Sequence, residues 1–150
     1  GILQYLMNKY GMNIDEMLNI LNKKSGMEGI SGVSSDFRDL EEGAEKGNER
    51  CALAREKFAY EVKKLIGAYA AVMGGVDAII FTAGVGENDA LERMQIASGL
   101  EYMGVKMDED ANNVRGEERV ISATDSKVKV LLIPTNEELM IAMDTASLVG

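Results

Sequence analysis

The stretch VDAIIFTAGVGEN, residues 76–88, decides the fold class that this sequence predicts. Residues 76–81 form a short, partly β-branched apolar run bounded by glycine, which is typical of a buried strand in a parallel sheet. A glycine loop follows the run directly, and a helical pattern begins at about Asp89. A strand, a loop and a helix in this order predict an α/β protein, with the loop at the carboxyl end of the strand.

The same order of elements recurs near the end of the chain. Residues 128–133 form a second predicted strand, Pro134 ends it, and a helix is predicted over residues 136–148. Residues 100–126 are polar and poorly periodic, with a short strand predicted at Val120 and Ile121. These strands are few for a sheet, so we expect neighbouring strands to lie in chain outside this sequence.

The first half of the sequence is rich in predicted helices. Apolar spacing predicts helices over residues 2–10, from Asn13 to just before Gly26, over residues 36–46 and over residues 49–73. Residues 26–35 hold three glycines and three serines and are predicted to be a loop. The long helix carries apolar residues at helical spacing, which predicts one buried face: Ala54, Phe58, Val62, Leu65, Tyr69 and Val72.

Composition narrows the class of protein. The chain has 150 residues and is 46% apolar, enough to fill the core of one domain. Its net charge of −9 argues against a nucleic-acid partner, whose phosphates are usually met by a basic face. No apolar run approaches the roughly 20 residues of a membrane span, and no signal peptide is apparent. We therefore expect a cytoplasmic protein without a membrane partner.

The lack of histidine, the single cysteine and the first residue also bear on the chemistry and the extent of this chain. The sequence contains no histidine, which removes the commonest general base. Cys51 is the single cysteine, so no internal disulfide or thiolate metal cluster can form, and its apolar helical setting predicts a buried, inert thiol. The sequence starts at Gly1 inside an apolar run. We therefore expect it to be a segment of a longer protein.

The glycine loop after the first strand is the sharpest candidate site. Gly84 and Gly86 allow the backbone to turn sharply and to approach a ligand that a Cβ atom would keep away. The start of the next helix offers free N–H groups to a phosphate, and Asn88 is placed to cap that helix or to bind a ligand. No Gly-Lys-Ser/Thr follows, so the loop is not a P-loop. On spacing alone, a tight turn between strand and helix explains it equally well.

A second candidate precedes the helix predicted over residues 36–46. Residues 34–36 are all suitable helix caps, and capping alone accounts for them. Phe37 and Arg38 follow, and a guanidinium can stack on a base and donate several hydrogen bonds. Arg38 can also simply pair with Asp36 and Asp39 at the surface, so the residues alone leave both interpretations open.

A third candidate lies at the start of the last predicted helix. Thr135 and Glu138 have the spacing of a capping box, which leaves Glu137 without a capping role. The helix dipole keeps a first-turn carboxylate ionised, and Mg²⁺ usually takes one or two such ligands from a protein. A favourable first-turn acid with no ligand is the alternative.

Taken together, these segments resemble the carboxyl-terminal part of the acetate kinases, which belong to the acetate and sugar kinase, heat-shock-protein and actin-like superfamily. The resemblance extends over essentially the whole chain, and its marks are residues 22–26, 29–32, 34–40, 82–88 and 133–139. It implies a helix-rich α/β segment with few strands, part of an actin-like (ribonuclease H-like) ATPase domain. Residues 1–150 would then be the nucleotide-binding part of a two-domain kinase whose upstream domain is absent.

The resemblance also implies a reaction and a set of site residues. The reaction is phosphoryl transfer between ATP and acetate, giving ADP and acetyl phosphate, with Mg²⁺ as the metal. The matching positions imply an adenosine pocket, a nucleotide-binding glycine loop and a magnesium ligand. The pocket residues are Asp36, Phe37 and Arg38; the loop residues are Gly84, Val85, Gly86 and Asn88; the metal ligand is Glu137.

The family is homodimeric, and its acetate pocket, phosphate-stabilising arginines, catalytic histidine and second metal-site residue all precede the matching segment. We therefore expect no catalytic residue here and no activity from this chain alone. The stretch over residues 34–39 favours acetate, while a propionate or butyrate kinase stays an alternative. A stand-alone nucleotide-binding or dimerisation module without catalysis is a further alternative, since unpaired strand edges need a partner.

Overall fold

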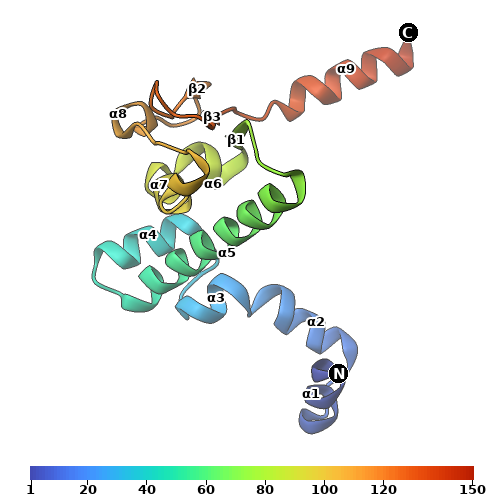
Figure 1. Cartoon of the computed structure of the whole chain (residues 1–150). Coiled ribbons are helices and arrows are strands. Elements are labelled where there is room, and N and C mark those ends of the chain that lie inside the picture. The colour runs from blue at the N-terminus through green and yellow to red at the C-terminus, as the bar shows by residue number, and fades with distance from the viewer. The chain divides into compact units, whose positions relative to one another are not determined.

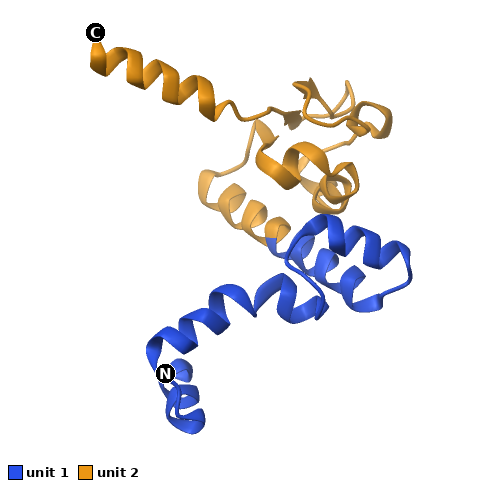
Figure 2. Cartoon of the chain, turned by 180° about the vertical axis from the view of Figure 1, so that it is seen from behind, with its two compact units in different colours: residues 1–61 blue, residues 62–150 orange.

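Helices make up the first part of the chain, and a small sheet forms in the second (Figure 1). The computed structural model describes residues 1–150 and divides them into two units, residues 1–61 and residues 62–150 (Figure 2). The long helix α5 (Glu49–Met73) contributes residues to both units. None of the helices combines the length and apolar character that a membrane span requires.

The first unit follows the predicted helices closely. It contains α1 (Ile2–Tyr10), α2 (Ile14–Lys23) and α4 (Phe37–Glu45) before α5 begins. Helix α2 starts with a capping box. Its Asn13 side chain accepts the Glu16 N–H at 2.9 Å, and the Glu16 carboxylate accepts the Asn13 N–H at 2.8 Å. The polar residues therefore set this boundary where the sequence predicts it.

One further helix, α3 (Gly26–Ser31), occupies a stretch that the sequence predicts to be a loop, so that prediction was wrong. Glycine and serine are weak helix formers, but Met27 and Ile30 share one face and pack against the core of the unit. The Arg50 guanidinium also donates to the carbonyls of Ile30 at 2.8 Å and Gly29 at 3.1 Å. Apolar burial and satisfied carbonyls outweigh the low propensity here.

The core of the first unit lies between α4 and α5. Leu40, Cys51 and Ala54 are fully buried there, which confirms the predicted burial of the cysteine. Gly43 allows this close approach, since a Cβ atom at that position would lie 2.6 Å from the Cys51 Sγ atom. The packing fixes the start of α4, which carries one of the candidate segments.

The second unit contains a mixed sheet of three strands. Strand β1 (Ala78–Phe81) pairs in parallel with β3 (Lys129–Leu132), and β2 (Arg119–Val120) pairs antiparallel with β3, giving the order β1-β3-β2. Both main strands and the short third one lie where the sequence predicts them, and the parallel pairing is confirmed. The helix-rich α/β class is therefore correct.

Burial of the first strand differs from the prediction. Along β1 only Phe81 is buried, and Ile80 is 53% exposed. In β3, by contrast, Val130 and Leu132 have no exposed surface. The difference follows from strand order, because β1 lies at an edge of this sheet and β3 at its centre.

Four helices and one short 3₁₀ turn complete the second unit. They are α6 (Ala83–Asn88), α7 (Ala90–Ala97), the 3₁₀ turn Glu101–Met103, α8 (Glu109–Asn112) and α9 (Glu137–Val149). Helices α7 and α9 correspond to the predicted helices over about 89–99 and 136–148. The poorly periodic stretch between them forms short elements only.

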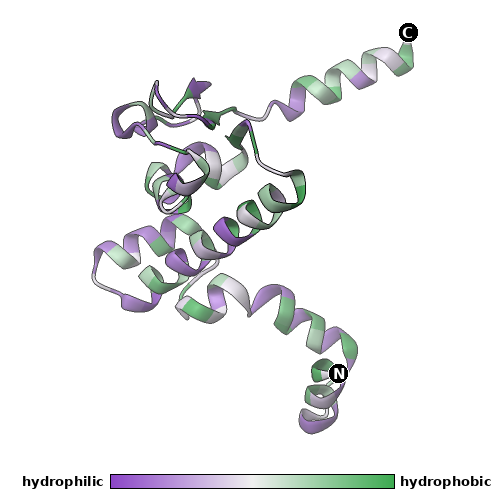
Figure 3. Ribbon diagram, viewed as in Figure 1, coloured by the Kyte–Doolittle hydropathy of each residue, from purple (hydrophilic) through white to green (hydrophobic).

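Two apolar helix faces of the second unit are exposed. Leu65, Tyr69 and Val72 of α5 were predicted to be buried, but they are 57%, 64% and 87% exposed. Helix α9 contains no buried residue at all, and apolar residues recur along it (Figure 3). The helical spacing was correct, but no element of this unit covers these faces, so the predicted burial was wrong.

Candidate functional site

Two candidate segments leave the sheet at the same edge. The last residues of the parallel strands, Phe81 and Leu132, are paired in register, and the N–H of Ile133 donates to the carbonyl of Phe81 at 3.0 Å. Residues 82–88 and residues 133–137 therefore both follow the carboxyl ends of their strands. This edge is where open α/β sheets usually bind ligands.

The glycine stretch is a one-turn helix, α6, and not the open loop that the sequence predicts. Its first residue, Ala83, has φ 59°, a left-handed conformation that is costly for a residue with a Cβ atom. The Glu87 side chain accepts the Ala83 N–H at 2.7 Å and so stabilises this turn. That N–H is consequently not available to a phosphate.

The two glycines of α6 have different surroundings. A Cβ atom on Gly84 would meet nothing within 4 Å, whereas one on Gly86 would lie 3.4 Å from the carbonyl carbon of Phe81. Gly84 therefore faces open space, and Gly86 faces strand β1. Only the first of them offers a backbone surface that a ligand can approach.

The remaining residues of the stretch are partly engaged in contacts within the protein. Asn88 is exposed, and its amide donates to the Gly84 carbonyl at 2.9 Å. It does not cap the next helix, because Asp89 does so by accepting the N–H of Glu92 at 2.9 Å. Val85 is half-buried in the same turn. The capping role predicted for Asn88 is therefore wrong, while its place beside Gly84 is as expected.

Glu87 is a site residue that the sequence analysis missed. The carboxylate oxygen that binds Ala83 also accepts the Thr135 N–H at 2.8 Å and the Thr135 hydroxyl at 3.0 Å. The hydrogen bond from the Thr135 N–H is the main cause that lowers the pKa of Glu87. No sequence signal identifies this contact, since Glu87 and Thr135 are 48 residues apart.

Arg93 was missed as well. It is fully buried, and its guanidinium donates to the Gly86 carbonyl at 2.8 Å. It also donates to the Asn112 side chain at 2.8 Å and carbonyl at 2.6 Å, and to the Val114 carbonyl at 2.7 Å. Burial lowers the pKa of Arg93. A signal existed, because Arg93 shares a helix face with the apolar residues Ile96 and Ala97.

Glu137 is the first residue of α9 and is exposed. The predicted capping box is absent, because Thr135 donates to Glu87 and Asn136 instead accepts the Leu139 N–H at 3.1 Å. Glu137 thus stays without a capping role. It borders an open hollow of about 450 Å³, lined also by Thr135, Asn136, Met140 and Ile141.

The donor set suits one metal better than others. No group of three His, Cys, Asp or Glu side chains converges in the structure. A zinc or calcium site, which needs several protein ligands, is therefore not supported. A lone exposed carboxylate such as Glu137 fits Mg²⁺, which keeps most of its waters and takes one or two carboxylates.

The third candidate segment lies in the first unit. Asp36 caps α4 by accepting the Arg38 N–H at 2.9 Å, and it also pairs with the Arg38 guanidinium, with a closest distance of 2.6 Å. Hydrogen bonding to the Arg38 side chain lowers the pKa of Asp36 to about 2. The Phe37 ring packs edge-to-face on Phe58, with centroids 4.7 Å apart.

The Asp36–Arg38 pair confirms the surface pairing that the sequence analysis left open. The Arg38 side chain is nevertheless 88% exposed, so the pair leaves one face of its guanidinium accessible. This segment and the sheet edge belong to different units.

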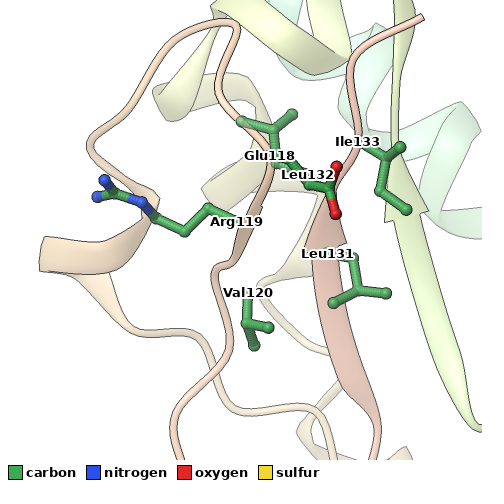
Figure 4. A pocket seen from close by; sticks show the side chains of 6 residues that line it. All are labelled: Glu118, Arg119, Val120, Leu131, Leu132 and Ile133. Atoms are coloured by element: carbon green, nitrogen blue, oxygen red, sulfur yellow. The ribbon is translucent and has the colours of Figure 1, made fainter.

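A second, smaller hollow of about 240 Å³ lies over strands β2 and β3 (Figure 4). No predicted site residue lines it: its walls are Glu118, Arg119, Val120, Leu131, Leu132 and Ile133. Four of the six are aliphatic, and the others are one acid and one arginine. It offers no convergent polar groups.

Comparison with known proteins identifies related chains. The model of the acetokinase family matches residues 1–143. Acetate kinase of Thermoanaerobacterium thermosaccharolyticum is 59% identical over 150 residues, covering 99% of this chain and 38% of that protein. Acetate kinase of Dictyoglomus turgidum is 61% identical over 145 residues, covering 97% of this chain and 36% of that protein.

Solved structures agree with these relatives. The crystal structure of Porphyromonas gingivalis acetate kinase matches with a TM-score of 0.92 and 46% identity, covering all of this chain and 38% of that one. A propionate kinase from Francisella tularensis matches with a TM-score of 0.83 and 38% identity, covering 94% of this chain and 36% of that one. This chain thus spans less than two fifths of the length of the proteins it matches.

Proposed function

The chain belongs to the acetokinase family, and from that premise we propose that it is the carboxyl-terminal, nucleotide-binding segment of an acetate kinase. The whole enzyme would transfer the γ-phosphoryl group of ATP to an acetate oxygen, giving ADP and acetyl phosphate, and would work in the cytoplasm as a homodimer. This segment would supply the adenine-nucleotide site and one ligand of Mg²⁺.

The observation that carries this proposal is the open backbone of Gly84 at the carboxyl edge of the sheet. A Cβ atom there would enter the space that a ligand needs, and nothing of the protein fills it. The neighbouring positions Val85, Gly86 and Asn88 complete the turn. We assign nucleotide contact to Gly84, Val85 and Asn88, and to Gly86 the close packing on strand β1 that shapes the turn. Backbone approach of this kind needs no excess of basic residues, which suits the net charge of −9.

Asp36, Phe37 and Arg38 form the proposed adenosine side of the site. The capping and pairing of Asp36 hold the Arg38 guanidinium in one orientation, and Phe37 anchors the helix start on Phe58. A planar, exposed guanidinium is suited to stack on a purine ring. The three residues would thus position the base.

Glu137 is the proposed protein ligand of Mg²⁺. When bound, the metal would neutralise charge on the phosphates during phosphoryl transfer. The open hollow beside Glu137 leaves room for the metal's waters. The groups that act on the transferred phosphoryl would lie in the rest of the protein, so this segment would bind without catalysing.

A second candidate concerns the acyl substrate. The match to a propionate kinase with a TM-score of 0.83 is the observation that favours a longer acyl acid. Acetate remains our proposal, because the acetate kinases compared are 59% and 61% identical. Phosphorylation of propionate but not acetate by the whole protein would reverse this choice. Nucleotide binding without any turnover by the whole protein would instead support a non-catalytic module.

Isothermal titration of the 150-residue chain with MgADP tests the proposal. We expect saturable binding that weakens about tenfold in Arg38→Ala, because base stacking contributes roughly 1–3 kcal/mol. Arg119→Ala is a matched control, since Arg119 also pairs with an acid two residues away, Glu117, at 2.5 Å. Equal affinities of Arg38→Ala and wild type would remove Arg38 from the site. Absence of heat from the wild type would contradict nucleotide binding itself.

A further inference from the structure

A single carboxylate oxygen joins the glycine helix to the start of α9. The Oε1 atom of Glu87 accepts the Ala83 N–H at 2.7 Å, the Thr135 N–H at 2.8 Å and the Thr135 hydroxyl at 3.0 Å. The half-buried side chain thus binds its own helix and a segment 48 residues further along the chain. Hydrogen bonds to an ionised acceptor are stronger than those between neutral groups.

No other hydrogen bond joins residues 134–150 to the rest of their unit. Sheet pairing holds the chain as far as Ile133, whose N–H binds the Phe81 carbonyl at 3.0 Å. Beyond it, Asn136 and the residues of α9 bond only within their own helix. Helix α9 has no buried residue either, so packing does not hold it in this unit. The hydrogen bonds of Glu87 with Thr135 are therefore the one polar connection, or tether, between the segment that carries Glu137 and the rest of its unit.

The other end of the tether is also defined. The bond to Ala83 holds the left-handed turn that begins α6, directly before Gly84. Thr135 lies two residues before Glu137. One side chain therefore connects the backbone proposed to bind the nucleotide with the backbone proposed to present the metal ligand.

We propose that Glu87 is a positioning residue that holds Glu137 at a fixed position relative to the nucleotide-binding turn at Gly84, so that the metal and the nucleotide bind together. The proposal rests on the function proposed above. In this role Glu87 acts through Glu137, because the oxygen that forms the tether is used by the protein. Its removal should weaken binding of the magnesium complex and spare binding of the metal-free nucleotide.

Titrations with MgADP, and with ADP in excess EDTA, separate this role from a merely structural one. We expect Glu87→Ala to weaken MgADP binding about tenfold, the lower end of the loss for groups that orient metal ligands. Metal-free ADP binding should change by less than about twofold, because α6 loses only the hydrogen bond from the Ala83 N–H and keeps the one that joins Asn88 to the Gly84 carbonyl. Thr135→Ser keeps both donors and should bind as wild type. Thr135→Val removes only the hydroxyl and should show a smaller loss with the same dependence on magnesium.

Glu137→Gln supplies the second half of the test. If Glu87 acts through Glu137, adding Glu87→Ala to Glu137→Gln should cost less than about twofold more, because coupled residues are not additive. Glu109→Gln, an exposed acid elsewhere in the unit, is the matched control. Circular dichroism melting of each variant shows whether it is folded. If Glu87→Ala does not fold, Thr135→Val, which keeps two of the three hydrogen bonds to Glu87, replaces it in the test.

Three results would overturn the inference. One is an equal loss of affinity for MgADP and metal-free ADP, which would mean that Glu87 only stabilises the fold. Another is full additivity of Glu87→Ala and Glu137→Gln. The third is wild-type MgADP affinity in Glu87→Ala, which would leave the proposed function intact. Failure of the wild-type chain to bind MgADP would instead contradict the proposed function, and this inference with it.

Discussion

Gly84 and Gly86 lie on the same short helix, and their different neighbours allow a matched pair of substitutions. Gly84→Ala should keep the fold, because its Cβ meets nothing within 4 Å and alanine favours helices by about 0.5–1 kcal/mol over glycine. The same methyl should weaken MgADP binding about tenfold, since an overpacked contact costs about 1–3 kcal/mol. Thermal melting and calorimetric titration measure the two effects.

Gly86→Ala is the control for this prediction. Its Cβ would contact Phe81 inside the protein at 3.4 Å, so nucleotide affinity should stay within about twofold of wild type. Unchanged affinity in Gly84→Ala, or an equal loss in both variants, would contradict the assignment of the open face to the nucleotide.

The Asp36–Arg38 pair makes a prediction about pH. The pKa of Asp36 is lowered from 3.8 to about 2, first by the side-chain hydrogen bond of Arg38. The folded state then binds this proton less readily than the unfolded chain, so the pair's contribution to stability is present above about pH 4. It is lost as the pH falls through about 2. In Arg38→Gln, a carboxyl-carbon NMR titration should show a higher pKa for Asp36.

The same titration defines the contradicting result. The pKa should stay below 3.8 in Arg38→Gln, because the backbone N–H of position 38 still caps the helix. An unchanged pKa near 2 would show that the guanidinium is not the cause. Salt should raise the wild-type pKa, since both side chains are in contact with solvent.

Residue-level prediction succeeded where the determinants are local. Asp36 as a helix cap and Glu137 as a first-turn acid follow from neighbours within a helical turn. Glu87 could not be assigned in this way, because its partner lies 48 residues further along the chain. The apolar neighbours of Arg93 indicate its burial, but its hydrogen-bond partners about 20 residues further along could not be predicted. The Thr135 cap failed for the same reason: Glu87, a distant residue, takes both of its donors.

At the scale of elements, Arg93 connects α7 with α6 and with the end of α8. Its fully buried guanidinium satisfies three carbonyls and the Asn112 side chain. Arg93→Met should lower the free energy of unfolding by about 3–5 kcal/mol, the usual loss when one partner of a buried charged network is removed. Urea unfolding followed by circular dichroism measures the change.

A graded pair of variants tests the cause. Arg93→Lys keeps the charge but cannot reproduce the planar fork, so its loss should be smaller than that of Arg93→Met. Arg119→Met, at a partly exposed arginine, should change stability by less than about 0.5 kcal/mol. Stability of Arg93→Met equal to wild type would show that these elements are held by packing alone.

The elements that the sequence predicted best are those whose pattern is complete within themselves. Strands β1 and β3 follow from short apolar runs, and α2 follows from its capping box. Helix α3 was missed because its stability comes from two apolar side chains packed on a core formed elsewhere in the chain. The exposed second half of α5 was mispredicted because periodicity identifies an apolar face and not the element that covers it.

At the scale of the whole molecule, the chain spans less than two fifths of the length of the acetate kinases compared. It covers 38% and 36% of the two acetate kinases compared, and it contains no histidine. We predict that the 150-residue chain forms no acetyl phosphate from MgATP and acetate above the rate without protein. The residues that we propose would bind the nucleotide, and none of them would act on the transferred phosphoryl group. Trapping acetyl phosphate with hydroxylamine measures this rate.

The contradicting outcome would be ATP-dependent product that disappears in Glu137→Gln. That result would place catalytic groups within these 150 residues and would require a different assignment of the site. Product that persists in Glu137→Gln would instead indicate a contaminating enzyme.

The central claim is that this chain binds an adenine nucleotide at the carboxyl edge of its sheet. Amide NMR spectra of the chain, recorded during titration with MgADP, test it most directly. The account predicts that the resonances of Gly84, Val85, Asn88 and Glu137 shift together and saturate at one dissociation constant. Unchanged resonances at these positions, with or without shifts elsewhere in the chain, would contradict it.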